Sequence, residues 1–257
     1  MKKVKLSYAH NNSVAQILLD DGKGNVLDNE MMLELLSCFK EFSENKNLKL
    51  IIFQGEGKHF SFGASVSEHT QEFAEMMLKT FHQLFFNLIE LSVPTLSKVS
   101  GQCLGGGMEL AIMCNFIFAD QSARFGLPEI VLGVFPPPAS IILPEKIGLG
   151  KAEEILLTGR ILTAAEALGL GLVHQVFEDK PTMDRLTDEW IEQYIIPKSA
   201  SSLRYGVKAA RAKFNHVFRN FIQQLESIYL RQLMQTKDAN EGINAFLEKR
   251  VPIWLNE

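Results

Sequence analysis

Cysteine, excess charge and long apolar runs are all scarce in this chain of 257 residues. The three cysteines, Cys38, Cys103 and Cys114, are odd in number and widely spaced, which excludes a disulfide framework and a CxxC metal pair. No stretch approaches the roughly 18 uninterrupted apolar residues of a membrane helix. The polar N-terminus, MKKVKLSYAHNNS, lacks the apolar run of a signal peptide. These absences predict a soluble protein of the reducing cytoplasm, with no membrane partner.

Neither sign of charge is in large excess. The 26 basic and 30 acidic residues give a net charge of −4, so composition provides no reason to expect a nucleic-acid partner. Apolar residues make up 46% of the chain and charged residues 22%, which is close to the globular average and excludes wholesale disorder.

The first half of the chain alternates strand and helix signals. Short apolar runs at 14–20, 48–55 and 94–101 predict buried strands, and helical spacing of apolar residues predicts a long helix over 72–91. Strands separated by helices imply right-handed crossovers and a mostly parallel sheet. From Lys151 onward helical signals dominate. We therefore expect an α/β core followed by a helical C-terminal portion.

Two turns rich in small residues follow predicted strands. The first is GKHFSFGAS (57–65), where backbone N–H groups without partners could point at a ligand oxygen. A plain tight loop is the alternative. The second, KVSGQCLGGGMEL (98–110), places Gly106 and Gly107 at a helix N-terminus, where the helix dipole favours negative charge. Its spacing matches neither the phosphate-binding loop nor the dinucleotide-binding motif.

Two carboxylates accompany these turns. Glu109 lies in the first turn of the predicted helix, where it could also simply compensate the dipole. Glu129 lies between Pro128 and an apolar run, where desolvation would raise the pKa of its carboxyl and suit it to acid–base work. A helix-start glutamate after proline is the alternative. Together, two donor turns could polarise a carbonyl, and two carboxylates could hold one water and move its protons.

These motifs, in this order and with these separations, resemble the enoyl-CoA hydratase/isomerase (crotonase) superfamily, over nearly the whole chain. HFSFGAS is similar to the first oxyanion-hole motif of that family, which implies that Ala64 supplies one N–H. GQCLGGGMEL is similar to the second, which implies that Gly106 supplies the other. Glu109 and Glu129 match both catalytic glutamates of the family's hydratases.

The resemblance also implies an architecture and a binding mode. It implies a spiral of ββα units, with a catalytic core at 1–195 and a C-terminal helical region at 196–257 that forms trimers, commonly paired into hexamers. AFLEKR resembles the family's C-terminal motif, so that Phe246 and Lys249 help to hold coenzyme A. Coenzyme A is part of the substrate, no separate cofactor is implied, and the sequence has no histidine or cysteine cluster at metal-ligand spacing.

Departures from the common pattern point to one subgroup. Ser65 stands where many members have aspartate, Leu127 where glutamine is usual, and VFPPPASIILP where a glycine-rich stretch is common. The three prolines remove N–H donors. With FGASVSEH and SASSLR, these features resemble cyclohexa-1,5-diene-1-carbonyl-CoA hydratases of anaerobic benzoyl-CoA breakdown. The resemblance implies hydration of the cyclic dienoyl thioester to 6-hydroxycyclohex-1-ene-1-carbonyl-CoA.

A cyclic acyl group implies an apolar pocket. The candidate substrate-binding residues, besides the coenzyme A contacts, are Phe62, Ser65, Val66, Leu127 and Phe135. Other interpretations remain open from the sequence: a 2-enoyl-CoA hydratase of fatty-acid oxidation, an enoyl-CoA isomerase, a ring-opening hydrolase, or a catalytically silent scaffold or RNA-binding member of the same family.

Overall fold

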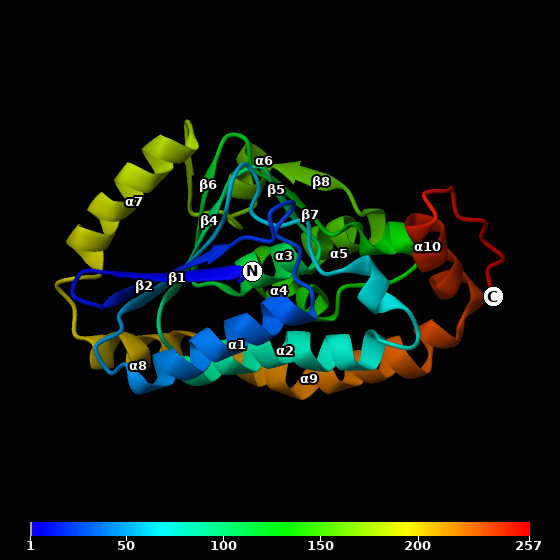
Figure 1. The fold of residues 1–257 in the computed structure, drawn as a ribbon, viewed down its shortest axis with the longest axis horizontal. Helices are drawn as coiled ribbons and strands as arrows, with labels where there is room; N and C mark the ends of the chain where they lie inside the picture. The colour runs from blue at the N-terminus through cyan, green and yellow to red at the C-terminus, as the bar shows by residue number, and fades with distance from the viewer. Residues whose placement is uncertain (1) are drawn as a thin grey trace.

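The structure is a computed structural model that describes residues 2–257, and it is built on two mixed β-sheets covered by helices (Figure 1). The larger sheet has the strand order β1-β2-β3-β4-β6-β9, in which only the β1–β2 pair is antiparallel. Its strands are β1 (Val4–Ala9), β2 (Val14–Leu19), β3 (Leu50–Gly55), β4 (Thr95–Val99), β6 (Phe116–Asp120) and β9 (Gln175–Phe177). The predicted parallel α/β core is confirmed.

The smaller sheet consists of three short strands, none of which the sequence patterns indicated. They are β5 (Gln102–Leu104), β7 (Arg124–Gly126) and β8 (Ile161–Thr163). β5 pairs parallel to β7, and β7 pairs antiparallel to β8. This sheet brings the segment before Gly106 beside the segment before Glu129, so it holds both sequence motifs in one place.

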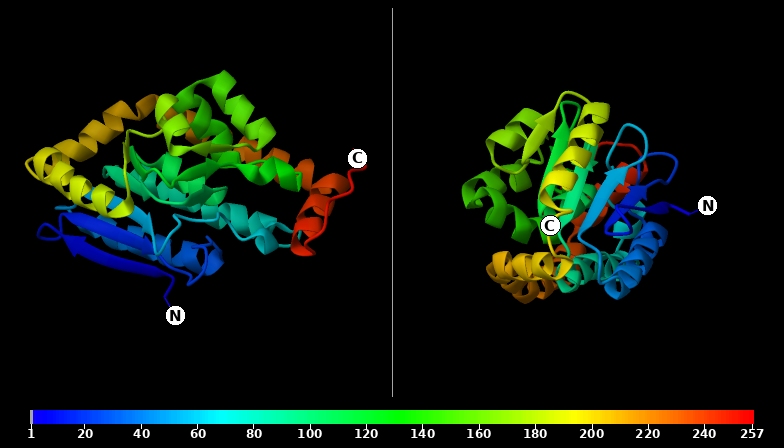
Figure 2. Two further views of the ribbon diagram at one scale, coloured as in Figure 1. Left: turned by 90° about the horizontal axis from the view of Figure 1, so that it is seen from above. Right: turned by 90° about the vertical axis from the view of Figure 1, so that its left-hand side faces the viewer.

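Helices surround the sheets and make up the C-terminal part of the chain. In Figures 1 and 2, α1, α2 and α9 run lengthwise along one side of the molecule, while α10 closes one end. The α-helices are α1 (Asn29–Glu44), α2 (Ala74–Leu91), α3 (Gly106–Met113), α4 (Pro137–Ile147), α5 (Leu149–Thr158), α6 (Ala164–Gly169), α7 (Lys180–Tyr194), α8 (Ala200–Ala210), α9 (Ala212–Arg231) and α10 (Lys237–Leu247). Three 3₁₀ helices are η1 (Val66–His69), η2 (Pro128–Leu132) and η3 (Leu233–Gln235).

Local sequence explains why the long helices form where they do. Asp28 caps α1 by accepting a hydrogen bond from the Met31 amide, and the buried side of this helix carries Met32, Leu35 and Phe39 at helical spacing. The α2 helix begins at Ala74, two residues later than the predicted start at residue 72, and ends at Ser92 in a left-handed conformation. Such helices gain their stability mainly by burying one apolar face against the sheets.

The C-terminal helices share the core of the sheets. Phe218, Ile222 and Tyr229 of α9 are buried in the same apolar cluster as strand residues such as Ile17 and Phe53. The division of the chain near residue 195 into a core and an oligomerisation region stays a prediction. Within residues 2–257, no helix is long and apolar enough to cross a membrane.

Candidate active site

A cavity of about 570 Å³ lies where the two motifs, η2 and the C-terminal helices meet. Its walls are mostly apolar, which is typical of sites for small organic ligands. The residues that line it include Phe62, Gly63, Ala64, Ser65, Val66, His69, Met77, Leu78, Phe81, Gly105, Gly106, Glu109, Glu129, Val131, Leu132, Phe135, Pro136, Pro137, Tyr229, Phe246 and Leu247.

The two predicted amide donors, those of Ala64 and Gly106, face the same space. Gly63 adopts φ +99°, a conformation that favours glycine, and its carbonyl accepts a hydrogen bond from the Leu27 amide. A Cβ built on Gly106 would lie 3.1 Å from the Ala64 nitrogen, so the two residues are in contact. Within residues 2–257, neither amide donates to a protein acceptor. Two free donors, of which Gly106 lies at the start of α3, form a ready site for a developing oxyanion.

Glu109 occupies the first turn of α3 and is almost fully buried. Its Oε1 accepts a hydrogen bond from the Ala139 amide, 2.8 Å away. Burial, together with the neighbouring charge of Glu129, raises the pKa of the Glu109 carboxyl well above its usual value. A structural carboxylate would be more exposed or paired with a cation, so these surroundings favour a chemical role.

Glu129 faces Glu109 from η2. Burial raises the pKa of its carboxyl from 4.5 to about 7, and Oε2 has no hydrogen-bond partner. A Cβ on Gly105 would lie 2.9 Å from its Oε1, so the glycine at φ +50° leaves room for this carboxyl beside the oxyanion turn. Two coupled carboxyls with raised pKa values can share one proton near neutral pH.

Two of three consecutive prolines, Pro136 and Pro137, line another part of the cavity wall. Pro136 precedes α4, and Pro137 and Pro138 are its first two residues, so the helix starts without two of its usual N–H donors. The first amide that remains belongs to Ala139, and it binds Glu109. The start of α4 therefore presents proline rings to the cavity, and its first free amide binds the Glu109 carboxyl.

Two partly buried basic side chains donate to the carbonyls at the C-terminal end of α3. Lys146 donates to the carbonyl of Cys114 over 2.8 Å, and Arg211 donates to the carbonyl of Met113 over 2.7 Å. These carbonyls end α3, where the helix dipole is negative. Lys146 and Arg211 therefore bind the C-terminal carbonyls of α3, and the N-terminal amides of this helix remain available to a ligand.

The structure brings most of the predicted site residues together. Besides the two glutamates and the two donor residues, the cavity is lined by Ser65 and Val66, and by the aromatic residues Phe62, Phe135 and Phe246. Phe62 and Phe246 are about half exposed, at 46% and 54%, which places them at the cavity mouth.

Two predicted substrate contacts do not line the cavity. Leu127 is fully buried in the apolar core, because it follows β7 directly and packs inward with the sheet. It is therefore not a wall of this cavity. Lys249 is exposed and lies two residues beyond Leu247, the last lining residue, so its contact with coenzyme A stays a prediction.

The sequence reasoning missed several lining residues. Met77, Leu78 and Phe81 belong to the buried face of α2, where their helical spacing indicated only core packing. Tyr229 lies on α9, in a stripe of buried apolar residues. A tyrosine within such a stripe is the one signal that could have suggested a polar role there.

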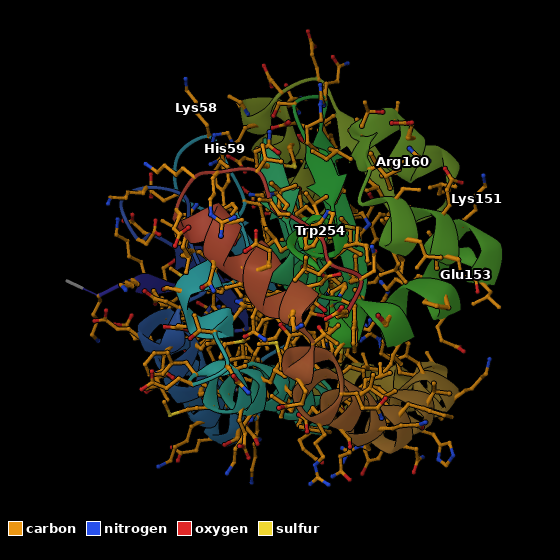
Figure 3. The ribbon with its side chains drawn as sticks, turned by 90° about the vertical axis from the view of Figure 1, so that its right-hand side faces the viewer. Lys58, His59, Lys151, Glu153, Arg160 and Trp254 are labelled. Carbon is orange, nitrogen blue, oxygen red and sulfur yellow. The ribbon has the colours of Figure 1, made fainter. Side chains whose placement is uncertain are left out.

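Figure 3 looks onto the end of the molecule that α10 closes. Trp254 lies near the middle of this face, with its ring against Gly133 and Gly242. Lys58 and His59 come from the loop after β3 at one edge of the face, while Lys151 and Arg160 lie on the α5 side. Cationic side chains thus flank the end of the molecule that carries Phe246.

Comparison with known proteins shows the family to which the chain belongs. The enoyl-CoA hydratase/isomerase family model matches residues 9–257. The chain is 39% identical over 253 residues to the cyclohexa-1,5-dienecarbonyl-CoA hydratase of Thauera aromatica, covering 98% of this chain and 97% of that protein. It is 35% identical over 234 residues to a probable enoyl-CoA hydratase of Mycobacterium tuberculosis, covering 89% and 88%.

A solved structure supports the fold in particular. The crystal structure of an enoyl-CoA hydratase from Mycobacterium avium subsp. paratuberculosis K-10 superposes with a TM-score of 0.86 at 22% identity, covering 98% of both chains. The α/β crotonase fold with C-terminal helices is therefore confirmed. The chain belongs to the enoyl-CoA hydratase/isomerase family, and it is a hydro-lyase of the enoyl-CoA hydratase type.

Proposed function

We propose that this enzyme hydrates cyclohexa-1,5-diene-1-carbonyl-CoA to 6-hydroxycyclohex-1-ene-1-carbonyl-CoA. The observation that carries the proposal is the proline-built start of α4, which presents apolar rings beside two buried carboxyls. A flat hydrocarbon ring needs an apolar wall, and Phe135, Pro136 and Pro137 supply one next to Glu109 and Glu129. The similarity to the Thauera aromatica enzyme, at 39% identity, points in the same direction.

The proposed chemistry starts at the thioester carbonyl. The amides of Ala64 and Gly106 bind its oxygen and stabilise the negative charge that develops there when water attacks the β-carbon. Glu109 and Glu129 hold that water, and one carboxylate takes its proton. The bond electrons of the attacked double bond move into a dienolate that extends over the second double bond.

The end of the reaction differs from ordinary enoyl hydration. Protonation at the distal carbon of the dienolate completes a 1,4-addition and leaves one double bond conjugated with the thioester. Because both carboxyls have raised pKa values, one of them can be protonated at neutral pH while the other is ionised. The pair thus contains both the base and the proton reservoir that the reaction requires.

Coenzyme A itself is held, in this proposal, at the cavity mouth. Phe246 lies there, and Lys249 follows α10 on the same end of the molecule. The net charge of −4 opposes an anionic substrate, so attraction has to come from local cations such as Lys249 and Lys58.

We also propose that the chain works as a homotrimer or homohexamer. Large apolar side chains remain exposed on η2, near the end of α5 and after α10, and include Val131, Leu157, Val251, Ile253 and Leu255. Exposed apolar patches of this kind are typical of association surfaces. Size-exclusion chromatography with light scattering would measure the molar mass of the assembly. A monomer at assay concentration would contradict this part of the proposal.

The decisive experiment compares two thioesters with one enzyme preparation. We expect hydration of the cyclic dienoyl-CoA with a higher kcat/KM than that of crotonyl-CoA, and a product whose hydroxyl lies on the ring carbon next to the thioester-bearing carbon. Preference for crotonyl-CoA would instead favour a general 2-enoyl-CoA hydratase, the function suggested by similarity to the Mycobacterium tuberculosis protein. The position of the hydroxyl can be read by NMR of the hydrolysed product.

A further inference from the structure

One hydroxyl in the cavity has no partner within the protein. Tyr229 on α9 is 1% exposed, and its Oη makes no hydrogen bond. The ring packs edge-on against Phe135, with 5.4 Å between the ring centroids. Among the cavity-lining residues that the structure describes, only one other side chain carries a buried oxygen without a partner, and that oxygen is Oε2 of Glu129.

Packing alone does not explain this hydroxyl. Phe218, Ile222 and Tyr229 form the buried stripe of α9, and phenylalanine at the last position would fill the same space. A buried donor without an acceptor costs free energy that phenylalanine would avoid. An unpartnered hydroxyl beside an unpartnered carboxyl oxygen is expected where the missing partner is a bound ligand.

Tyr229 has a proton to give at neutral pH. Burial, with the charges of Glu129 and Glu109, raises the pKa of its phenol above the usual value, so the hydroxyl keeps its proton at neutral pH. The phenol and both carboxyls line the same cavity. The phenol is therefore placed to receive a proton from one of them as it gives up its own.

His69 is the other titratable group in the cavity wall, and it is poorly suited to this task. Its Nδ1 donates a hydrogen bond to the Ser65 carbonyl over 2.8 Å. Burial lowers the pKa of the imidazole, so the ring is neutral at pH 7 and has no second proton on Nε2. Among the titratable side chains that line the cavity, Tyr229 is the neutral donor that remains beside the carboxyls.

The reaction of a cyclic dienoyl thioester needs a donor in a place that ordinary enoyl hydration does not. In ordinary hydration the hydroxyl and the proton go to neighbouring carbons, so two carboxyls around one water can serve both. In the 1,4-addition the proton goes to a carbon across the ring from the attacked carbon. The reaction therefore needs a proton donor on the side of the ring opposite the attacked carbon, besides the carboxyl that holds the water.

We propose that Tyr229 delivers the proton to the distal ring carbon of the dienolate, a role that rests on the proposed function above. The Tyr229 O–H bond breaks as the new C–H bond forms, and the dienolate electron pair makes that bond. The phenolate takes a proton from the carboxyl that received it from the attacking water. Water is thereby divided into the hydroxyl on one carbon and the hydrogen on the other, and the enzyme returns to its starting state.

The test is Tyr229→Phe, assayed with the cyclic dienoyl-CoA and with crotonyl-CoA. Loss of a general acid typically lowers turnover by about 10²–10⁴-fold. We expect the ratio of kcat for the dienoyl thioester to kcat for crotonyl-CoA to fall at least about a hundredfold, with the loss in kcat and not in KM. Tyr205→Phe makes the same chemical change at a tyrosine that is 69% exposed on α8, and should leave this ratio unchanged.

Each other outcome has a definite meaning. An equal loss with both thioesters, a rise in KM alone, or no loss in either assay would overturn proton delivery by Tyr229. Wild-type enzyme that hydrates crotonyl-CoA but not the dienoyl thioester would overturn the proposed function, and this inference with it. Residual crotonyl-CoA turnover and an unchanged melting temperature show that Tyr229→Phe is folded, so the two failures can be told apart.

Discussion

The main-chain amide of Ala139 donates a hydrogen bond to Oε1 of Glu109. This is the first amide of α4 that the three prolines leave available, so the positive end of that helix acts on the Glu109 carboxyl. The bond favours the ionised form and partly offsets the effect of burial on the pKa of Glu109. The prolines thus give an apolar wall without depriving Glu109 of its donor.

Ala139→Pro removes this hydrogen bond but leaves the side-chain contacts of Glu109 in place. Proline is tolerated in the first turn of a helix, where its missing N–H has no helical acceptor. The pKa of Glu109 should rise further, so the limb of the profile of kcat/KM against pH that Glu109 controls should move to higher pH. Ala139→Gly keeps the amide and should leave the limb in place; equal profiles for both variants would show that the bond is electrostatically unimportant.

Glu109→Gln and Glu129→Gln should each abolish most hydration while leaving the fold intact. Each glutamine keeps the shape of the side chain but cannot exchange a proton, and a positioned acid or base typically contributes about 10²–10⁴-fold to the rate. Steady-state kinetics with the preferred thioester, alongside circular dichroism, measures both effects. Near-wild-type turnover in either variant would rule out the two-carboxylate mechanism.

The raised pKa of Glu129 also predicts how stability depends on pH. The pKa of the Glu129 carboxyl is about 7 in the folded protein and 4.5 in the unfolded chain. Ionisation of this carboxyl therefore destabilises the folded state. The penalty is absent below pH 4.5 and complete above pH 7. Glu129→Gln should therefore gain stability over wild type as pH rises, by roughly 2–3 kcal/mol between about pH 5 and about pH 8.

Urea denaturation of wild type and Glu129→Gln at both pH values would measure that gain. Glu109→Gln should change in the same direction, because burial and the charge of Glu129 raise the pKa of Glu109 as well. A gain that is independent of pH would mean that glutamine improves packing and that the titration of Glu129 has no part in it.

Gly106→Ala should damage the oxyanion hole specifically. The new methyl group would lie 3.1 Å from the Ala64 nitrogen and 3.2 Å from the Phe81 ring, so it intrudes on the space between the two amide donors. Loss of one comparable donor costs about 2.7–4 kcal/mol of barrier. Gly150→Ala is the matched control, because a Cβ there meets nothing within 4 Å, and kcat should not change.

Local signals were sufficient for the long elements and for selecting the two glutamates that line the cavity. The apolar period around α1 and the buried run of β3 are strong because they extend over many residues. Glu109 and Glu129 could be identified because each stands next to its own donor turn or apolar run. The motifs carry this information within a few residues of chain.

The rest depends on contacts between distant parts of the chain. Strands of three residues, such as β7 and β8, carry no period and form only because pairing partners are nearby. Leu127 follows β7, so the direction of that strand decides that its side chain enters the core. Tyr229 reaches the cavity only because α9 packs on α4 and α2, a long-range arrangement that α9's own apolar stripe does not reveal.

The three cysteines have a practical consequence for handling the enzyme. Cys103 and Cys114 are buried and Cys38 is half-buried, and burial raises the pKa of each thiol, to about 11 for Cys38 and Cys114. Thiolates, not thiols, react with oxidants and alkylating reagents. We therefore expect full activity after storage in air without added reductant, even if the substrate belongs to an oxygen-sensitive metabolism.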